Sequence, residues 1–247
     1  MEIFVRSTVD GSMQPSLFYQ AKEKGRPLLV GLHTWSFDRH NQIENMLPLA
    51  KKYDFNLLLP EFRGPNLATN EKCTEACGSD ISKQDVIDAI DHVKKEYNVD
   101  ADNVFLLGLS GGGYMALMLC GVAPKMFRAV GAYVPITDLK KWTRQNSNYK
   151  SHVIACCSAD EDEMRRRSPV AYVEKIAKAN LKIFHGKWDD VVPVSHSIEL
   201  YSKIQEYNPN ARVFLEIFDG GHEIEMDVAE RWIISQYRGV EKKNVTG

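Results

Sequence analysis

Short apolar segments rich in β-branched and aromatic residues recur along the chain between polar stretches, and they predict eight strands. Several of these segments are apolar at consecutive positions rather than at alternate ones, which is typical of strands that helices cover on both faces. The pattern therefore predicts a buried sheet. The expected strands are Ile3–Arg6, Ser16–Gln20, Pro27–Leu32, Phe55–Leu59, Val104–Leu109, Ala129–Val134, Leu181–His185 and Val213–Phe218.

Apolar residues return at helical spacing between the later strands. Within Asp80–Tyr97, Val86, Ile90 and Val93 are four and three residues apart, which places them on one helix face. Similar patterns cover Ser195–Tyr207 and Glu223–Tyr237. Strands that alternate with helices after two early hairpin-like strands predict an α/β fold, with a mostly parallel eight-stranded sheet flanked by helices.

Residues 137–170 break this alternation, because they are polar and locally charged. Trp142 and Tyr149 lie in this segment, and Tyr172 follows it. Two interpretations stay open. The segment is either a short lid-like insertion near the carboxyl ends of the strands, where loops often line active sites, or a plain surface excursion. No repeat, low-complexity tract or linker divides the chain, so we expect a single domain over residues 1–247.

The composition is that of an ordinary globular protein, with 44% hydrophobic and 26% charged residues. A net charge of −2 and the lack of any block of like charge argue against a nucleic-acid partner. The first residues lack the charged-then-apolar pattern of a signal peptide, and no apolar run approaches the ~18 residues of a membrane span. We therefore expect a cytoplasmic location and no membrane contact.

The five cysteines do not suggest a disulfide framework, because their number is odd and the chain is of medium length. Cys73 and Cys77 have no second Cys or His pair at zinc spacing, and Cys156 and Cys157 are adjacent to each other. We interpret them as structural thiols. The sequence predicts no metal site and no organic cofactor.

A serine stands between an expected strand and an expected helix, in the sequence Gly108-x-Ser110-x-Gly112. This pattern alone is weak, since it also fits a tightly packed turn. In a nucleophile elbow, however, glycines flank a serine in a strained turn and relieve the clashes that side chains would create. The hydroxyl then lies at a helix N-terminus, where backbone N–H groups favour negative charge.

A serine nucleophile needs a base within hydrogen-bond reach, and the base needs an acid. Asp189 and Asp190 follow the strand at 181–185, and His222 follows Gly220-Gly221 after the last strand. The order Ser, Asp, His is that of the α/β-hydrolases, and all these groups lie beyond carboxyl ends of strands. The residues alone leave open which aspartate is the acid. Other histidines fit the base less well: His40, His92, His152, His185 and His196.

Acyl transfer also needs N–H donors for the tetrahedral oxyanion. The N–H of Gly111, directly after the serine, is one candidate. The N–H of Trp35 is the other, because the loop His33–Ser36 follows an early strand in the place of a glycine-rich oxyanion loop. Thr34, Trp35 and Ser36 replace the usual glycines there, which leaves the exact donor open.

The chain resembles the prolyl-oligopeptidase-like group of α/β-hydrolases, from about Pro27 to Tyr237. The resemblance rests on Phe62-Arg63-Gly64, on the serine motif, and on the segments SPVAYVEKI at 168–176, HGKWDDVVP at 185–193 and GGH at 220–222. It implies Ser110 as nucleophile, Asp189 as acid and His222 as base. Two departures favour a compact esterase over a peptidase: no β-propeller sequence is present, and the oxyanion loop lacks the tyrosine-bearing sequence of the peptidases.

We therefore predict a serine carboxylesterase that releases small, acetyl-like acyl groups through an acyl-enzyme. A carbohydrate deacetylase is a narrower version, since aromatic residues in 137–172 offer surfaces for sugar rings. The alternative is an aminopeptidase or acyl-peptide hydrolase, for which Glu161, Asp162 and Arg63 are candidate anchors of a peptide terminus, although surface or structural charge is the preferred reading of all three. A non-catalytic binding protein is the third reading. The expected partner is a small-molecule ester, and nothing in the sequence predicts the oligomeric state.

Overall fold

The eight expected strands form one sheet in the computed structural model, which describes residues 1–244. They are β1 (Glu2–Arg6), β2 (Met13–Tyr19), β3 (Arg26–Leu32), β4 (Asn56–Pro60), β5 (Val99–Leu109), β6 (Ala129–Tyr133), β7 (Leu181–Gly186) and β8 (Val213–Phe218). The strand order is β1-β2-β4-β3-β5-β6-β7-β8. Strand β2 is antiparallel to β1 and β4, and the others are parallel. The predicted fold class is confirmed.

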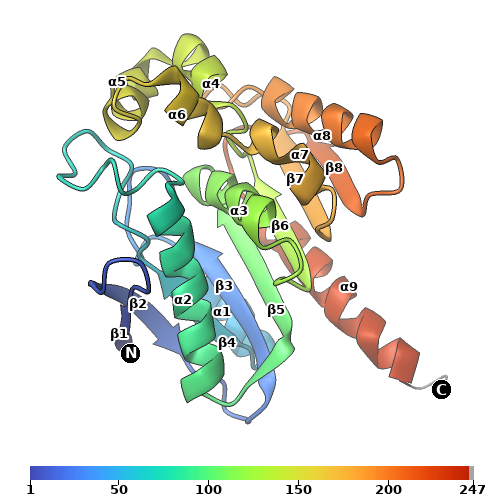
Figure 1. The fold of residues 1–247 in the computed structure, drawn as a ribbon. Coiled ribbons are helices and arrows are strands. Elements are labelled where there is room, and N and C mark those ends of the chain that lie inside the picture. The colour runs from blue at the N-terminus through green and yellow to red at the C-terminus, as the bar shows by residue number, and fades with distance from the viewer. Residues whose placement is uncertain (245–247) are drawn as a thin grey trace.

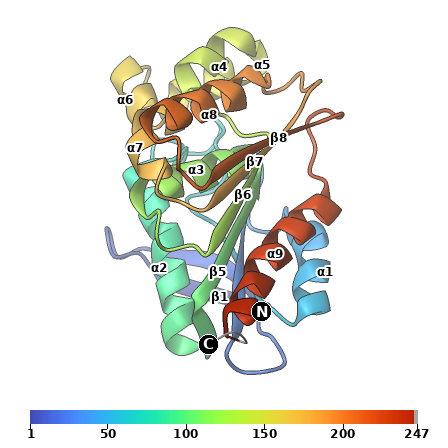
Figure 2. The ribbon, with the colours of Figure 1, turned by 90° about the vertical axis from the view of Figure 1, so that its right-hand side faces the viewer.

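Helices cover both faces of this sheet (Figures 1 and 2). Helices α2, α3, α7 and α8 lie on one face, and α1 and α9 lie on the other, so the parallel strands are buried between two layers. The helices are α1 (Ile43–Tyr53), α2 (Asp80–Glu96), α3 (Gly111–Val122), α4 (Leu139–Gln145), α5 (Ser147–Cys156), α6 (Glu161–Arg166), α7 (Val173–Ile176), α8 (Ser195–Tyr207), α9 (Met226–Asn244) and the 3-10 turn η1 (Pro169–Tyr172).

Strand β5 shows why its sequence is continuously apolar. Val104 and Leu106 belong to the hydrophobic core on one face of the sheet, and Phe105 and Leu107 belong to the core on the other. All four side chains are fully buried. Because successive side chains of a strand point to opposite faces, a strand between two helix layers needs apolar residues at every position.

The segment 137–170 is helical and packed. It carries α4, α5 and α6, which lie above the carboxyl ends of the strands (Figure 1). Leu139 and Trp142 of α4 and Val153 of α5 are buried in the core. The segment therefore contributes helices and buried side chains to the fold.

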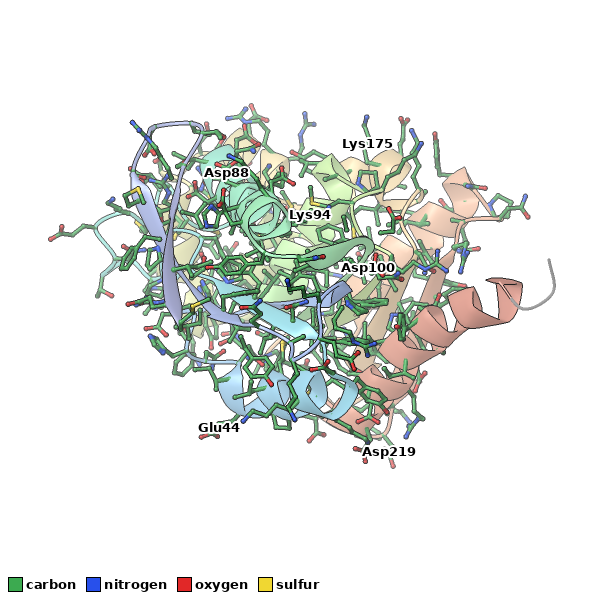
Figure 3. The ribbon with its side chains drawn as sticks, turned by 90° about the horizontal axis from the view of Figure 1, so that it is seen from below. Glu44, Asp88, Lys94, Asp100, Lys175 and Asp219 are labelled. Atoms are coloured by element: carbon green, nitrogen blue, oxygen red, sulfur yellow. The ribbon has the colours of Figure 1, made fainter. Side chains whose placement is uncertain are left out.

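The opposite edge of the sheet faces the viewer in Figure 3. In this view, α2 with Asp88 and Lys94 lies on one side of the sheet, and α1 with Glu44 lies on the other. All five cysteines are buried free thiols. None of the helices described within residues 1–244 combines the length and the apolar character that crossing a membrane requires.

Candidate active site

Ser110 lies in the turn between β5 and α3, with a φ of 56° and a ψ of −115°. A positive φ is unusual for a residue with a Cβ and costs on the order of 1–3 kcal/mol when the surroundings enforce it. Two hydrogen bonds enforce it here. The N–H of Ser110 donates to the carbonyl of Tyr133 at 2.9 Å, and its carbonyl accepts from the N–H of Tyr114 at 2.8 Å. The serine thus ends the strand and begins the helix.

His222 lies beside this serine, in the loop after β8. Its Nε2 is 2.9 Å from Ser110 Oγ, and its Nδ1 is 2.8 Å from Asp189 Oδ2. A carboxylate only accepts hydrogen bonds, so Nδ1 carries the proton and Nε2 is free to accept from the serine hydroxyl. The imidazole is 20% exposed, while the Asp189 side chain is fully buried.

Asp189 is held in the turn after β7. Its Oδ1 accepts from the N–H groups of Val191 at 2.9 Å and Val192 at 2.8 Å. Burial opposes the charge of this carboxylate, but hydrogen bonds from His185, His222 and the Val192 N–H outweigh it and hold the pKa of Asp189 well below its usual value. The carboxylate is therefore ionised at neutral pH.

The neighbouring candidates lie elsewhere. Asp190 is exposed to solvent, which leaves Asp189 as the aspartate beside His222. His185 is fully buried, with its Nε2 2.8 Å from the Val192 carbonyl and its Nδ1 2.7 Å from Ser197 Oγ, so it structures the turn that carries Asp189. The structure thus brings Ser110, Asp189 and His222 together.

Gly111 and Trp35 meet at the N-terminus of α3. A Cβ placed on Gly111 would overlap the backbone N and Cα of Trp35, so only glycine allows this approach. Neither N–H has a hydrogen-bond partner among the described residues. The ring of His33 helps to hold this loop, since its nitrogens lie 2.9 Å from the carbonyls of Thr34 and Glu61. No local pattern indicates that role of His33, because Glu61 lies 28 residues further along the chain.

The indole of Trp35 is only 2% exposed and packs against the insertion. Its ring centroid is 4.9 Å from that of Trp142 and 5.8 Å from that of Tyr114. Tyr149 stacks on Trp142 at 4.8 Å. Aromatic side chains from the β3–α1 loop, α3, α4 and α5 therefore pack together beside the loop that contacts Gly111.

Comparison with known proteins assigns this chain to a family. The model of the prolyl oligopeptidase family matches residues 71–237, which is more than half of the chain and includes all three site residues. The chain belongs to the prolyl oligopeptidase family. The expectation that the motifs raised is confirmed.

Curated relatives match this chain over part of their own length. Acylamino-acid-releasing enzyme 2 of Oryza sativa subsp. japonica is 28% identical over 87% of this chain and 30% of that enzyme. The human acylamino-acid-releasing enzyme is 28% identical over 66% of this chain and 24% of that enzyme. The inactive dipeptidyl peptidase 10 of Rattus norvegicus is 25% identical over 58% of this chain and 18% of that protein. The chain therefore spans less than a third of the length of these relatives.

Solved structures share the fold of this prolyl oligopeptidase family member. The acylaminoacyl peptidase of Pyrococcus horikoshii has a TM-score of 0.73 at 19% identity, over 90% of this chain and 37% of that one. An esterase of Pyrococcus furiosus has a TM-score of 0.71 at 17% identity, over 98% of this chain and 90% of that one. At these identities the likeness shows the α/β-hydrolase fold.

The candidate anchors for a peptide terminus do not join the site. Arg63, from the motif typical of the prolyl oligopeptidase family, has a fully buried side chain that pairs with Asp10, Glu75 and Asp85. Glu161 is exposed on α6 and pairs with Lys140 at 2.5 Å. Asp162 follows it on α6 and is also exposed. These charges are used structurally or lie in solvent.

Proposed function

We propose that this chain is a serine hydrolase that cleaves small carboxylic esters, with Ser110 as nucleophile, His222 as general base and Asp189 as the acid that orients it. One observation carries the proposal. It is the continuous hydrogen-bond chain from Ser110 Oγ through both nitrogens of His222 to Asp189 Oδ2, at 2.9 and 2.8 Å.

In the first step, Ser110 Oγ attacks the carbonyl carbon of the ester while His222 Nε2 takes the hydroxyl proton. The imidazolium that forms is stabilised by the ionised Asp189, which also fixes the tautomer. The tetrahedral intermediate collapses when its C–O bond to the alcohol breaks. His222 gives the proton to the departing alkoxide, and the acyl group stays on Ser110.

In the second step, water attacks the acyl-enzyme and gives its proton to His222. The bond between the acyl carbon and Ser110 Oγ then breaks, the proton returns to the serine, and a carboxylic acid leaves. Both tetrahedral intermediates carry an oxyanion. The N–H groups of Gly111 and Trp35 are suited to bind it, because the two residues are in contact and both amides lack partners among the described residues. Each such donor is commonly worth about 2.7–4 kcal/mol.

A small acyl group fits the surroundings of this site. Trp35 and Trp142 are packed against each other and are 2% and 1% exposed, so they fill space on one side of the serine turn. The same burial removes Trp142 as a surface for sugar stacking. Acylated carbohydrates therefore enter as one arm of the substrate test rather than as the leading proposal.

A second candidate is the release of N-acylated amino acids from peptides. It is favoured by the names of the curated relatives, which are acylamino-acid-releasing enzymes in several organisms. An acylated terminus carries no charge and needs no ionic anchor, so the burial of Arg63 among three carboxylates does not oppose it. An aminopeptidase, which must bind a free ammonium group, has less support.

The test is to label the wild-type chain and Ser110→Ala with a fluorophosphonate, and then to measure turnover. We expect labelling of the wild type only, and a loss of turnover of at least about 10³-fold in Ser110→Ala. The substrates are p-nitrophenyl acetate, acetylated xylo-oligosaccharides and N-acetyl-aminoacyl p-nitroanilides.

The outcomes separate the readings. Equal labelling of both proteins would exclude Ser110 as the nucleophile. Higher kcat/KM for the anilides than for the acetyl ester would replace the esterase proposal by the acylaminoacyl one.

A further inference from the structure

We propose that the insertion at 137–170 positions the catalytic acid, through Trp142 and Asn146, which hold the turn that carries Asp189. The inference rests on the proposed function, because it assigns Asp189 its role in the triad. Within the described residues, the side-chain N–H groups of Trp142 and Asn146 donate to Val191 rather than to Ser110 or His222, so they are positioning residues rather than catalytic ones.

A single carbonyl of the turn accepts two hydrogen bonds from the insertion. The oxygen of Val191 accepts from Trp142 Nε1 at 2.9 Å and from Asn146 Nδ2 at 3.0 Å. The N–H of the same Val191 donates to Asp189 Oδ1 at 2.9 Å. Val191 is therefore bonded to the insertion on one side and to the catalytic carboxylate on the other.

Both donors are themselves held in place. Trp142 is 1% exposed, and its ring packs on Trp35 of the oxyanion loop. Asn146 stands at the junction of α4 and α5, where its Oδ1 accepts from the N–H of Asn148 and its N–H donates to the carbonyl of Trp142. The amide group of Asn146 thus has one orientation, with its NH₂ directed at the turn.

The far side of the turn is anchored as well. His185 Nε2 lies 2.8 Å from the carbonyl of Val192, directly after Val191. Helix α4 is also joined to α8, since Gln145 Oε1 lies 2.9 Å from His196 Nε2 and Lys141 Nζ donates to Ser195 Oγ at 3.0 Å. The turn is therefore fixed between β7 and the insertion, and α4 cannot move away from it without breaking these bonds.

This arrangement links two halves of the catalytic machinery. Trp142 contacts the oxyanion loop through its ring and the acid turn through its N–H. If the Val191 carbonyl loses its donors, Asp189 loses one of the restraints that keep its Oδ2 opposite His222 Nδ1, while the Val192 N–H and His185 remain. Substrate binding does not depend on that bond, whereas orientation of the imidazole does, so the effect belongs in kcat rather than in KM.

The variants are chosen to remove donors and little else. Trp142→Phe keeps an aromatic ring without the N–H, and Asn146→Asp keeps the oxygen that caps α5 without the NH₂. The control is Asn148→Asp, which adds the same charge at an exposed position two residues away. Each protein is examined by ester turnover and by proton NMR of the imidazole N–H between His222 and Asp189.

For Trp142→Phe/Asn146→Asp we expect kcat to fall at least 10-fold, KM to change less than twofold, and the downfield imidazole N–H resonance to weaken or move upfield. Asn148→Asp should match the wild type in all three. If the double variant fails to fold by circular dichroism, the two single variants are measured in the same way, with at least a threefold fall in kcat expected for each.

An unchanged kcat and resonance in folded variants would overturn the positioning role while leaving the hydrolase proposal intact. An inert wild type, unlabelled by fluorophosphonate, would instead overturn the hydrolase proposal. The N–H resonance needs no substrate, and it would then still show whether the insertion holds Asp189 against His222.

Discussion

At the scale of single residues, His196 on α8 shows how the fold fixes a protonation state. The imidazole is fully buried, and burial lowers its pKa to about 3, with Lys141 and His185 adding to the effect and Asp189 opposing it. Its Nδ1 accepts a hydrogen bond from the N–H of Thr137 at 3.2 Å. The Nε2 therefore carries the proton and donates a hydrogen bond to Gln145 Oε1. The neutral imidazole of His196 is therefore the form that satisfies both hydrogen bonds.

This burial predicts an acid sensitivity with a definite sign. The pKa in the folded state, about 3, is below the ordinary value of 6.5, so the unfolded chain takes up a proton that the folded chain refuses. Buried, neutral His196 therefore contributes fully to the free energy of unfolding above pH 6.5. This contribution is lost as the pH falls toward the folded-state pKa, at roughly 1.4 kcal/mol per pH unit. Urea unfolding between pH 7 and pH 4 should show a steeper loss for the wild type than for His196→Asn. Parallel curves would contradict the assignment.

At the scale of elements, the strands were predictable because each has a local signal, a short apolar run. The same logic missed α1 (Ile43–Tyr53), since Pro48 lies in its interior, lacks an N–H and usually ends a helix. The helix persists because Met46, Leu49 and Ala50 are buried against the sheet. Tertiary packing outweighs the local preference at that point.

The ends of two strands carry a further prediction. A Cβ on Gly186, at the end of β7, would overlap the backbone carbonyls of Gly221 and Gly220, which cannot rotate away as a side chain can. Gly186→Ala should therefore push aside the loop that carries His222 and lower kcat/KM by about 100-fold. In contrast, a Cβ on Gly221 would have no atom within 4 Å, so Gly221→Ala is the matched control. Equal activities of the two variants would contradict this account.

The candidate site was predictable only where its signals are local. Ser110, Asp189 and His222 each follow a strand and have glycines or a motif beside them. Trp142 and Asn146 carry no such signal, because their shared acceptor, Val191, is 49 and 45 residues away along the chain. No spacing rule joins an insertion helix to a distant turn.

At the scale of the whole molecule, Arg63 ties separate parts of the chain together. Its guanidinium bonds Asp10 in the β1–β2 turn at 2.9 Å, Glu75 in the loop before α2 at 2.8 Å, and Asp85 on α2 at 2.5 Å. The guanidinium and the Asp85 carboxylate are 0% and 1% exposed. Its partners are 53, 12 and 22 residues away, so no local spacing in the sequence indicates which carboxylates it pairs with.

Removing this arginine should destabilise the fold as a whole. In Arg63→Met, Asp85 would keep a buried charge without its partner, and breaking such pairs costs about 3–5 kcal/mol. Urea unfolding at pH 7 measures the loss. Adding Asp85→Asn to Arg63→Met should recover part of it, because the stranded charge is then gone. A loss below about 1 kcal/mol in the single variant would show that the cluster is not a stabilising link.

The backbone conformation of Ser110 suits the proposed chemistry but lowers the stability of the fold. Its positive φ places the hydroxyl where His222 can reach it, but it is a backbone shape that any residue with a Cβ resists. Folding would favour glycine at this position, whereas the proposed chemistry requires an oxygen there. The protein thus keeps a strained backbone conformation at Ser110, and the packing of the surrounding fold has to compensate for its cost. If selection acted on stability alone, a glycine would be expected to replace Ser110.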